Sequence, residues 1–286
     1  TSTNSSIGLI YALKKIFIKY IELIMKFGIT QGRLTNTKKN ILQKFPTNWK
    51  KEFEYLNETN LHYIELFLEN KFNPHNPIWN SIGQRKLKKL IKKTKLKSSI
   101  VCDNFIINKD LNSEKIIKYY RKLFLSLKKI NCKLLIVPLE GINLKKKIEY
   151  NSVIKFIKMI NFMSKKVNIR VSFEFNEEIS IFKKIIKDTK INSLKITFDT
   201  GNFFLKNKNL IKTLSQYLNY VNHIHLKGRD KFGNNVILGT GLINFSKIIV
   251  FLKKNKYKKC LTFETHRGKN AIMTANQNLL EIKSYI

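Results

Sequence analysis

The chain alternates between short apolar runs and longer stretches in which apolar residues recur at every third or fourth position. The short runs are typical of buried strands, and the longer stretches are typical of amphipathic helices. The expected strands are residues 25–31, 61–67, 99–103, 134–140, 169–175, 194–199, 220–227 and 260–264. The expected helices are residues 49–57, 82–94, 113–130, 147–165, 177–189, 207–217, 245–252 and 271–284.

This alternation predicts an α/β fold, namely a single-domain (β/α)8 barrel (a TIM barrel) formed by residues 25–286. A doubly wound sheet is the alternative, but it rarely contains eight such regular units. Gly28 and Gly32 also make no GxGxxG phosphate-binding motif after the first strand. Residues 1–24 are expected to be a helical or disordered N-terminal extension, or a non-native one. Lysines interrupt the apolar segment 7–25, so we expect no membrane span.

The formal net charge of +36 at pH 7 raises the question of nucleic-acid binding. Six of the 55 basic residues are arginines, and the lysines are spread over every expected helix. Because arginine is preferred where phosphate is bound in bidentate geometry, the pattern favours solvated helix faces and codon bias over a nucleic-acid surface. The cysteines Cys102, Cys132 and Cys260 form no CxxC motif and indicate reduced thiols in a cytoplasmic protein.

Each expected strand contributes one polar side chain near its carboxyl end, the face that carries the active site in barrels of this class. These residues are Gln31, Glu65, Asp103, Glu140, Glu174, Asp199, His225 and Glu264. A strand-end acid can also cap the following helix, and this remains an alternative for Glu65, Asp103 and Glu140. Capping is a poorer explanation for the last four strands, which end in succession with Glu, Asp, His and Glu.

Three carboxylates and one imidazole form a hard, oxygen-rich ligand set that suits Mn²⁺, Mg²⁺ or Co²⁺. The set is Glu174, Asp199, His225 and Glu264. His223 lies two residues before His225, on the same face of the strand but deeper. We therefore expect His225 to be the ligand and His223 to support it or to belong to the core.

Six short segments carry a resemblance to a known family. They are residues 27–34, 173–174, 198–202, 223–227, 238–241 and 263–264. In order and spacing they resemble the xylose isomerase-like TIM barrel superfamily, in particular sugar phosphate isomerases and epimerases similar to D-tagatose 3-epimerase. The resemblance spans residues 26–284. One position departs from the pattern, since Asn202 stands where such epimerases usually carry a histidine.

The resemblance implies that Glu174, Asp199, His225 and Glu264 bind one divalent metal ion. It also implies that Glu174 and Glu264 act as the acid and base that move a proton through an enediolate. Other polar residues are expected to contact a sugar or sugar phosphate, with the basic ones holding a phosphate or carboxylate. These residues are Gln31, Glu65, Glu140, Asn202, Lys227, Arg229 and Arg267.

Three alternatives stay open. A dehydratase or hydroxypyruvate-type isomerase on the same scaffold would use the same metal and bases. An endonuclease IV-like nuclease would need three zinc ions, but Glu65, Asp103 and Asn202 stand where that class offers histidine. A metal-free sugar-binding barrel would lack part of the ligand set, which is complete here. The expected partner is a small sugar and neither nucleic acid nor a membrane; homo-oligomerisation is left open.

Overall fold

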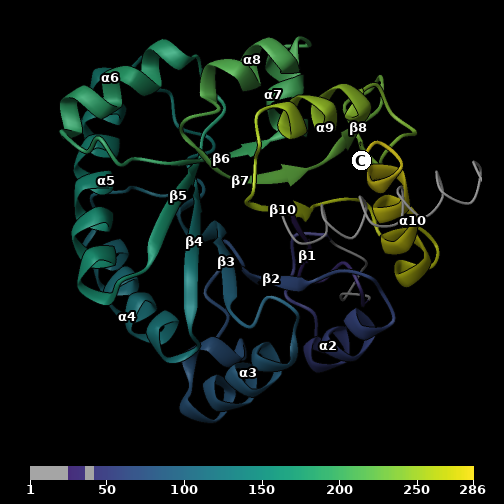
Figure 1. The fold of residues 1–286 in the computed structure, drawn as a ribbon. Helices are drawn as coiled ribbons and strands as arrows, with labels where there is room; N and C mark the ends of the chain where they lie inside the picture. Colours follow the sequence, from purple (N-terminus) through teal and green to yellow (C-terminus); the bar gives the residue numbers. More distant parts are fainter. Residues whose placement is uncertain (1–24, 36–41) are drawn as a thin grey trace, which may run out of the picture.

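The computed structural model describes residues 25–35 and 42–286, and within them the strands form one closed barrel. The prediction for residues 1–24 lies outside the described residues. The barrel strands are β1 (Lys26–Thr30), β2 (Tyr63–Leu68), β3 (Ser99–Asp103), β4 (Cys132–Pro138), β5 (Arg170–Glu174), β6 (Ile196–Asp199), β7 (Val221–Leu226) and β10 (Cys260–Phe263). They pair in parallel in the order β1, β10, β7, β6, β5, β4, β3, β2. Figure 1 shows these strands at the centre of a ring of helices.

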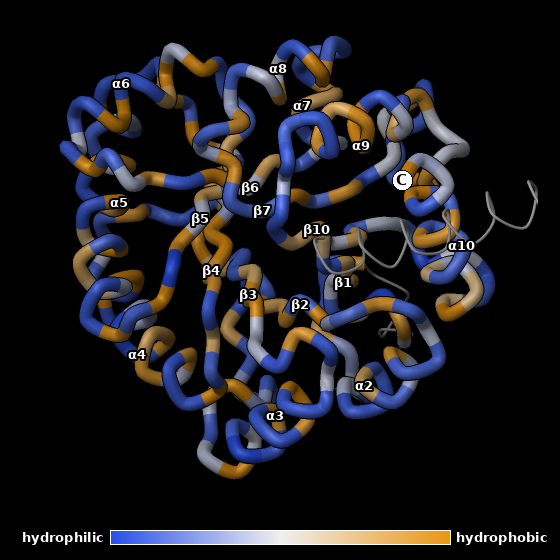
Figure 2. The backbone as a smooth tube through the Cα atoms, viewed as in Figure 1, coloured by the Kyte–Doolittle hydropathy of each residue, from blue (hydrophilic) through white to orange (hydrophobic). Residues whose placement is uncertain are grey.

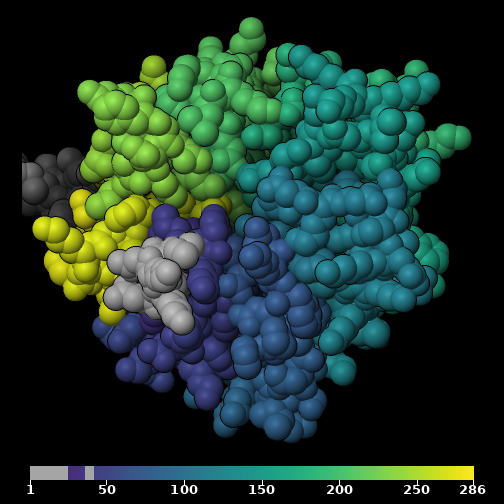
Figure 3. Space-filling model, turned by 180° about the vertical axis from the view of Figure 1, so that it is seen from behind, coloured from purple at the N-terminus to yellow at the C-terminus, as the bar shows by residue number. Residues whose placement is uncertain are grey.

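The surrounding helices are α2 (Trp49–Asn57), α3 (Ser81–Lys93), α4 (Glu114–Lys129), α5 (Lys147–Val167), α6 (Ile179–Thr189), α7 (Thr200–Lys206), α8 (Leu210–Tyr217), α9 (Phe245–Lys254) and α10 (Ala271–Lys283). The predicted (β/α)8 barrel is therefore confirmed. Seen from behind, the segments follow one another around the molecule in sequence order (Figure 3). Among the described residues, no helix is both long and apolar enough to cross a membrane.

Two features after the sixth and seventh strands escaped the sequence pattern. Helix α7 begins directly after β6, because the Asp199 side chain accepts a hydrogen bond from the Asn202 backbone N–H at 2.7 Å and caps it. The long turn after β7 contains a small antiparallel pair, β8 (Gly228–Arg229) and β9 (Asn235–Val236). Both features lie at the carboxyl ends of their strands, and they add polar residues to that face.

The apolar core consists of two clusters on opposite sides of the sheet. The larger fills the space between the strands and the helices. The helices alternate between blue and orange segments in Figure 2, as amphipathic helices do when one side packs on a sheet. The smaller cluster lies inside the barrel and consists of Tyr63, Ile100, Cys102, Leu134 and Ile136.

The Tyr63 side chain fits inside the barrel because its neighbour on β1 is a glycine. Gly28 pairs with Tyr63 in the register, and a Cβ at position 28 would lie 2.2 Å from the tyrosine ring. The ring is buried, and its hydroxyl lies 2.8 Å from Thr262 Oγ1. The ring of Tyr63 therefore belongs to the apolar cluster inside the barrel, while its hydroxyl contacts the polar side chain of Thr262.

We expect Gly28→Ala to lower the free energy of unfolding by about 1–3 kcal/mol, because the added methyl group overpacks this layer. Urea denaturation would measure the change. The double variant Gly28→Ala/Tyr63→Leu should lose less than the two single variants added together, since removing the ring makes room for the methyl group. An unchanged midpoint for Gly28→Ala alone would contradict this account of the packing.

Candidate active site

The strand register brings the predicted ligand set into one layer of the barrel. Asp199 on β6 pairs with His225 on β7, and His225 pairs with Thr262 on β10. Side chains alternate along a strand, so Glu264, two residues after Thr262, points to the same side. Glu174 ends β5 next to β6. The four side chains of the set are all buried.

The ligand set converges on one atom, His225 Nδ1. This nitrogen lies 3.1 Å from Glu264 Oε2, 3.5 Å from Glu174 Oε2 and 3.8 Å from Asp199 Oδ2. Within the described part of the chain it makes no hydrogen bond of normal geometry. Burial would lower the pKa of His225, but Glu65, Glu174 and Glu264 raise it well above its usual value, so these carboxylates favour a positive charge among them. The arrangement, with three carboxylates and one imidazole, therefore fits a divalent metal ion.

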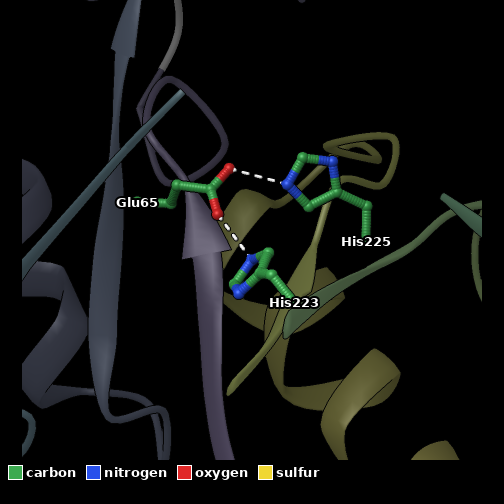
Figure 4. A group of neighbouring side chains, drawn as sticks. All are labelled: Glu65, His223 and His225. Atoms are coloured by element: carbon green, nitrogen blue, oxygen red, sulfur yellow. Dashed lines mark hydrogen bonds and ion pairs between the residues drawn. The ribbon is translucent and has the colours of Figure 1, made fainter. Parts of the chain in front are cut away.

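Glu65 holds the other side of the same imidazole. Its Oε1 lies 3.0 Å from His225 Nε2, and its Oε2 lies 2.8 Å from His223 Nε2 (Figure 4). Thr262 Oγ1 donates a further hydrogen bond of 2.8 Å to Oε2. With a metal ion bound, a proton on His225 Nε2, facing Glu65, would leave the Nδ1 lone pair free to bind that ion. Carboxylate–histidine pairs of this kind orient metal ligands.

These contacts refine two predictions about position. Glu65 lies in the middle of β2 and not at its end, since β2 continues to Leu68. Burial alone would raise the pKa of the Glu65 carboxyl, but the charge of His225 and hydrogen bonds from both histidines lower it to about 2. His223 is fully buried one step below His225, as predicted, and its pKa is lowered mainly by burial. Glu65 is therefore an ionised partner of two histidines.

The two predicted catalytic glutamates have different surroundings. Burial raises the pKa of Glu174, and the neighbouring charge of Asp199 adds to this effect. Burial would also raise the pKa of Glu264, but Lys227, His225 and Arg33 outweigh it and lower that pKa well below its usual value. The pKa values of these two carboxyl groups are therefore shifted in opposite directions.

Three donors from outside the ligand set surround Glu264 Oε1. Gln43 Nε2 donates a hydrogen bond of 2.8 Å, Lys227 Nζ lies 3.1 Å away, and Arg33 Nη2 lies 3.9 Å away. Lys227 Nζ also lies 2.9 Å from Asp199 Oδ2. Burial would lower the pKa of Lys227, but Asp199 and Glu264 raise it, so the ammonium stays charged. Lys227 therefore lies beside the candidate ligand set, and its contact with a substrate stays a prediction.

Sequence reasoning missed Arg33 and Gln43. Arg33 is one of six arginines in a lysine-rich chain and lies in the first segment of the family resemblance, so a signal existed. Its side chain is 1% exposed, and its guanidinium donates to the Leu42 carbonyl oxygen. Gln43 lies in the connection between β1 and α2, where no periodic pattern marks its importance.

The side chain of Asn202, which replaces the expected histidine, links three other residues. Its Nδ2 donates to Glu140 Oε1 at 2.8 Å and to Glu174 Oε1 at 2.7 Å, and its Oδ1 accepts from Arg229 Nη2 at 3.0 Å. The pKa of Glu140 is raised to about 7, mainly by burial and then by the charge of Glu174. A Cβ on the preceding residue, Gly201, would lie 2.9 Å from both Arg229 Nε and the Lys227 stem. Glycine at this position therefore lets both basic side chains reach the site.

A cavity of about 210 Å³ opens onto these groups. Its lining is Thr30, Gln43, Glu65, Phe67, Cys102, Asn104, Pro138, Glu140, Glu174, Asn202, Lys227, Arg229 and Glu264. Five of the seven residues expected to contact the substrate are in this lining. A larger hollow, about 1010 Å³, lies outside the barrel between α4 and α5; no acid or histidine lines it, so it offers no proton-transfer chemistry.

The other two residues expected to contact the substrate, Gln31 and Arg267, are buried outside this lining. Gln31 Oε1 accepts a hydrogen bond from the Phe67 backbone N–H at 3.2 Å, and Arg267 Nη1 donates to the Thr35 carbonyl oxygen at 3.2 Å. A role for them in binding substrate stays a prediction.

The Asp103 side chain caps the following helix, which was the alternative to a role in the site. Its Oδ1 accepts from the Phe105 backbone N–H at 3.1 Å, in the short helix η3 (Asn104–Ile106), and from Tyr119 Oη on α4 at 2.9 Å. Its side chain therefore binds on the helix side of the sheet, away from the cavity.

Comparisons with known proteins place this geometry in a family. A family sequence model described as a xylose isomerase-like TIM barrel matches residues 53–284. The structure of D-psicose 3-epimerase with D-tagatose from Clostridium cellulolyticum H10 is similar, with a TM-score of 0.71 and 15% identity over 92% of this chain and 99% of that one. The apo form of 3-keto-D-glucoside 4-epimerase from E. coli gives a TM-score of 0.66 and 16% identity over 91% and 99%.

The structure of the IOLI protein with a binding zinc atom is also similar, with a TM-score of 0.66 and 16% identity over 91% of this chain and 96% of that one. A comparison with curated proteins finds no match. At these identities the structural matches demonstrate a shared fold, while the family match covers most of the chain. The resemblance predicted from the motifs is thus confirmed, and the chain belongs to the xylose isomerase-like TIM barrel family.

Proposed function

We propose that the protein is a divalent-metal-dependent isomerase or epimerase that acts on a sugar or sugar phosphate through an enediolate. The observation that carries this proposal is the position of His225 Nδ1, buried within 3.1 to 3.8 Å of carboxylate oxygens of three other residues. Membership of the family supports the proposal, and so do the sugars in the names of the structurally similar epimerases. The small, polar-lined cavity supports a hydroxylated substrate.

The ligand set of Glu174, Asp199, His225 and Glu264 would hold one Mn²⁺, Mg²⁺ or Co²⁺ ion. When bound, such an ion supplies positive charge that polarises the substrate carbonyl. Glu65 would keep His225 in the tautomer whose Nδ1 is free to bind. Lys227 and Arg33 add positive charge beside Glu264, where negative charge develops on the substrate oxygen.

Glu174 and Glu264 would carry the proton. One carboxylate removes the proton from the carbon next to the carbonyl, and the electron pair left on carbon moves toward the carbonyl oxygen to give the enediolate. The other carboxylate then delivers a proton to the opposite face of that carbon, which inverts it. Delivery to the neighbouring carbon would instead interconvert an aldose and a ketose. Both residues line the same cavity, as this chemistry requires.

Asn202 would orient Glu174 during this cycle. An amide cannot transfer a proton at neutral pH, but the Nδ2 donor fixes Glu174 Oε1 while Arg229 fixes the amide. Glu174 Oε2 then faces His225 Nδ1.

The rival readings are weaker. A dehydratase or hydroxypyruvate-type isomerase would use the same groups, and no contact in the described residues favours it. A three-zinc nuclease needs separate ligand sets. The second group of candidate ligands in the described residues is Glu65, His223 and His225, which shares His225 with the first. Asp103 binds Tyr119 on the helix side of the sheet and supplies no further ligand.

Metal content tests the proposal directly. Elemental analysis of protein purified without added metal, then loaded with Mn²⁺, should give one ion per chain for the wild type. Asp199→Ala should lose the ion, because a ligand oxygen 3.8 Å from His225 Nδ1 is removed. The control Asp188→Ala should retain it, because Asp188 binds the Tyr150 hydroxyl on the outer helices. Two or three zinc ions per chain would favour the nuclease, and no ion after loading would favour a metal-free binder.

A further inference from the structure

The cavity that holds the ligand set is small for a complete substrate site. Small-molecule sites usually have a volume of about 300–1,000 Å³. The cavity of about 210 Å³ lies below that range. A second hollow of about 520 Å³ adjoins it, and the two share Glu140 and Asn202 in their linings. Together the volumes of the two spaces fall within the usual range.

The second hollow is built from the segments that follow β4 and β5 and from the end of α7. Its lining is Leu139, Glu140, Gly141, Ile142, Asn143, Asn176, Glu177, Asn202, Leu205 and Lys206. This set contains both amides (Asn143, Asn176 and Asn202) and aliphatic side chains (Leu139, Ile142 and Leu205). Such a surface suits a sugar ring, which offers hydroxyl groups at its edge and C–H groups on its faces.

Charge in the second hollow disfavours an anionic ligand. Lys206 is the single basic residue of the lining, and it is paired with Glu177. Glu140 adds a second acid, and the nearby Arg229 donates to Asn202 and to the Gly233 carbonyl oxygen. A phosphate there would face Glu140 and a Lys206 ammonium that is already paired with Glu177. The ligand that fits is therefore uncharged.

The two residues that line both spaces, Glu140 and Asn202, connect the second hollow to the proposed catalytic residues. Asn202 Nδ2 donates to Glu140 and Glu174 at once, so one amide joins the border residue to a proposed catalytic residue. Glu140 is partly exposed and lies in both linings. A ligand whose reacting carbon lies beside Glu174 would pass Glu140 on its way into the second hollow.

We propose that the substrate is a glycosylated keto sugar: its keto-sugar unit lies in the inner cavity, and a second, uncharged sugar ring lies in the hollow beyond Glu140. This inference rests on the proposed function and narrows it from sugars in general to neutral sugars of two units. The hollow supplies binding energy remote from the reacting carbon, and such energy can be used to position that carbon.

Binding to the Mn²⁺-loaded protein tests the inference. The probes are D-fructose and three disaccharides in which glucose or galactose is attached to fructose: isomaltulose, lactulose and turanose. Isothermal titration calorimetry should show at least one disaccharide binding at least tenfold more tightly than D-fructose. If none of the three binds more tightly, the second hollow is not a sugar subsite and the inference is overturned.

A matched pair of tryptophan variants locates the effect. Ile142→Trp fills the hollow and should lower the ratio of kcat/KM for the preferred disaccharide to kcat/KM for D-fructose by at least tenfold. Ile148→Trp, on the neighbouring exposed surface of α5 (83% exposed), should leave that ratio unchanged. An unchanged ratio in Ile142→Trp overturns the inference. Turnover of D-fructose without any preference for a disaccharide would refute this inference and leave the proposed function standing. If no sugar binds or reacts, both fail.

Discussion

Glu174→Gln is expected to lower kcat for sugar isomerisation or epimerisation by about 10²–10⁴-fold, the usual contribution of a positioned acid or base. Glutamine has nearly the same shape and can keep the contact with Asn202 Nδ2, now 2.7 Å from Glu174 Oε1. It cannot accept the substrate proton. Exchange of the substrate C–H for deuterium in D₂O, followed by NMR, would measure the step itself. Glu264→Gln should reduce the same exchange, since each face of the carbon needs its own carboxylate.

Two checks separate loss of a base from loss of a ligand. Turnover should be measured at saturating Mn²⁺ with the bound metal quantified, because Glu174 also belongs to the ligand set. Glu178→Gln is the matched control, since Glu178 is an exposed acid at the start of α6 and should leave kcat unchanged. The proposed mechanism fails if Glu174→Gln and Glu264→Gln retain full turnover with metal bound.

Glu65→Gln is expected to weaken metal binding by about 10–100-fold, although Glu65 is not itself a ligand in our assignment. The carboxylate holds both His225 and His223 through their Nε2 atoms, at 3.0 and 2.8 Å. Glutamine offers one oxygen and one NH₂ group, so it cannot accept from both imidazoles. One histidine must then change tautomer or lose its partner. If His225 changes, its Nδ1 carries the proton and is no longer available to the metal.

Competition against a fluorescent chelator would measure the affinity for Mn²⁺. Asp103→Asn is the control, because Asp103 is an equally buried carboxylate one strand away that binds Tyr119 and the Phe105 N–H. Its loss should affect stability and leave metal affinity unchanged. Equal affinities for Glu65→Gln and wild type would show that Glu65 does not control the orientation of His225.

The sequence determined the order of strands and helices and the positions where polar residues end the strands. Both follow from local periodicity, because the hydrophobic effect selects which faces are buried and each element has a fixed repeat. The same periodicity placed His223 and His225 on one face of β7. Side-chain alternation also explains why Asp103 lies outside the cavity, since its neighbours Cys102 and Asn104 both line the cavity.

The tertiary structure decided what each polar residue does. Glu65 became the partner of two histidines because closure of the barrel lets side chains of β2 and β7, which are not neighbours in the sheet, meet in one interior. Gln43 contacts Glu264 across 221 positions of sequence, and no local pattern encodes such a contact. The capping of α7 by Asp199 and the adjoining hollow likewise depend on packing between distant segments. The sequence therefore determined the fold and the candidate ligand set, while strand register and loop packing determined which residues contact that set, because those contacts exist only after the barrel closes.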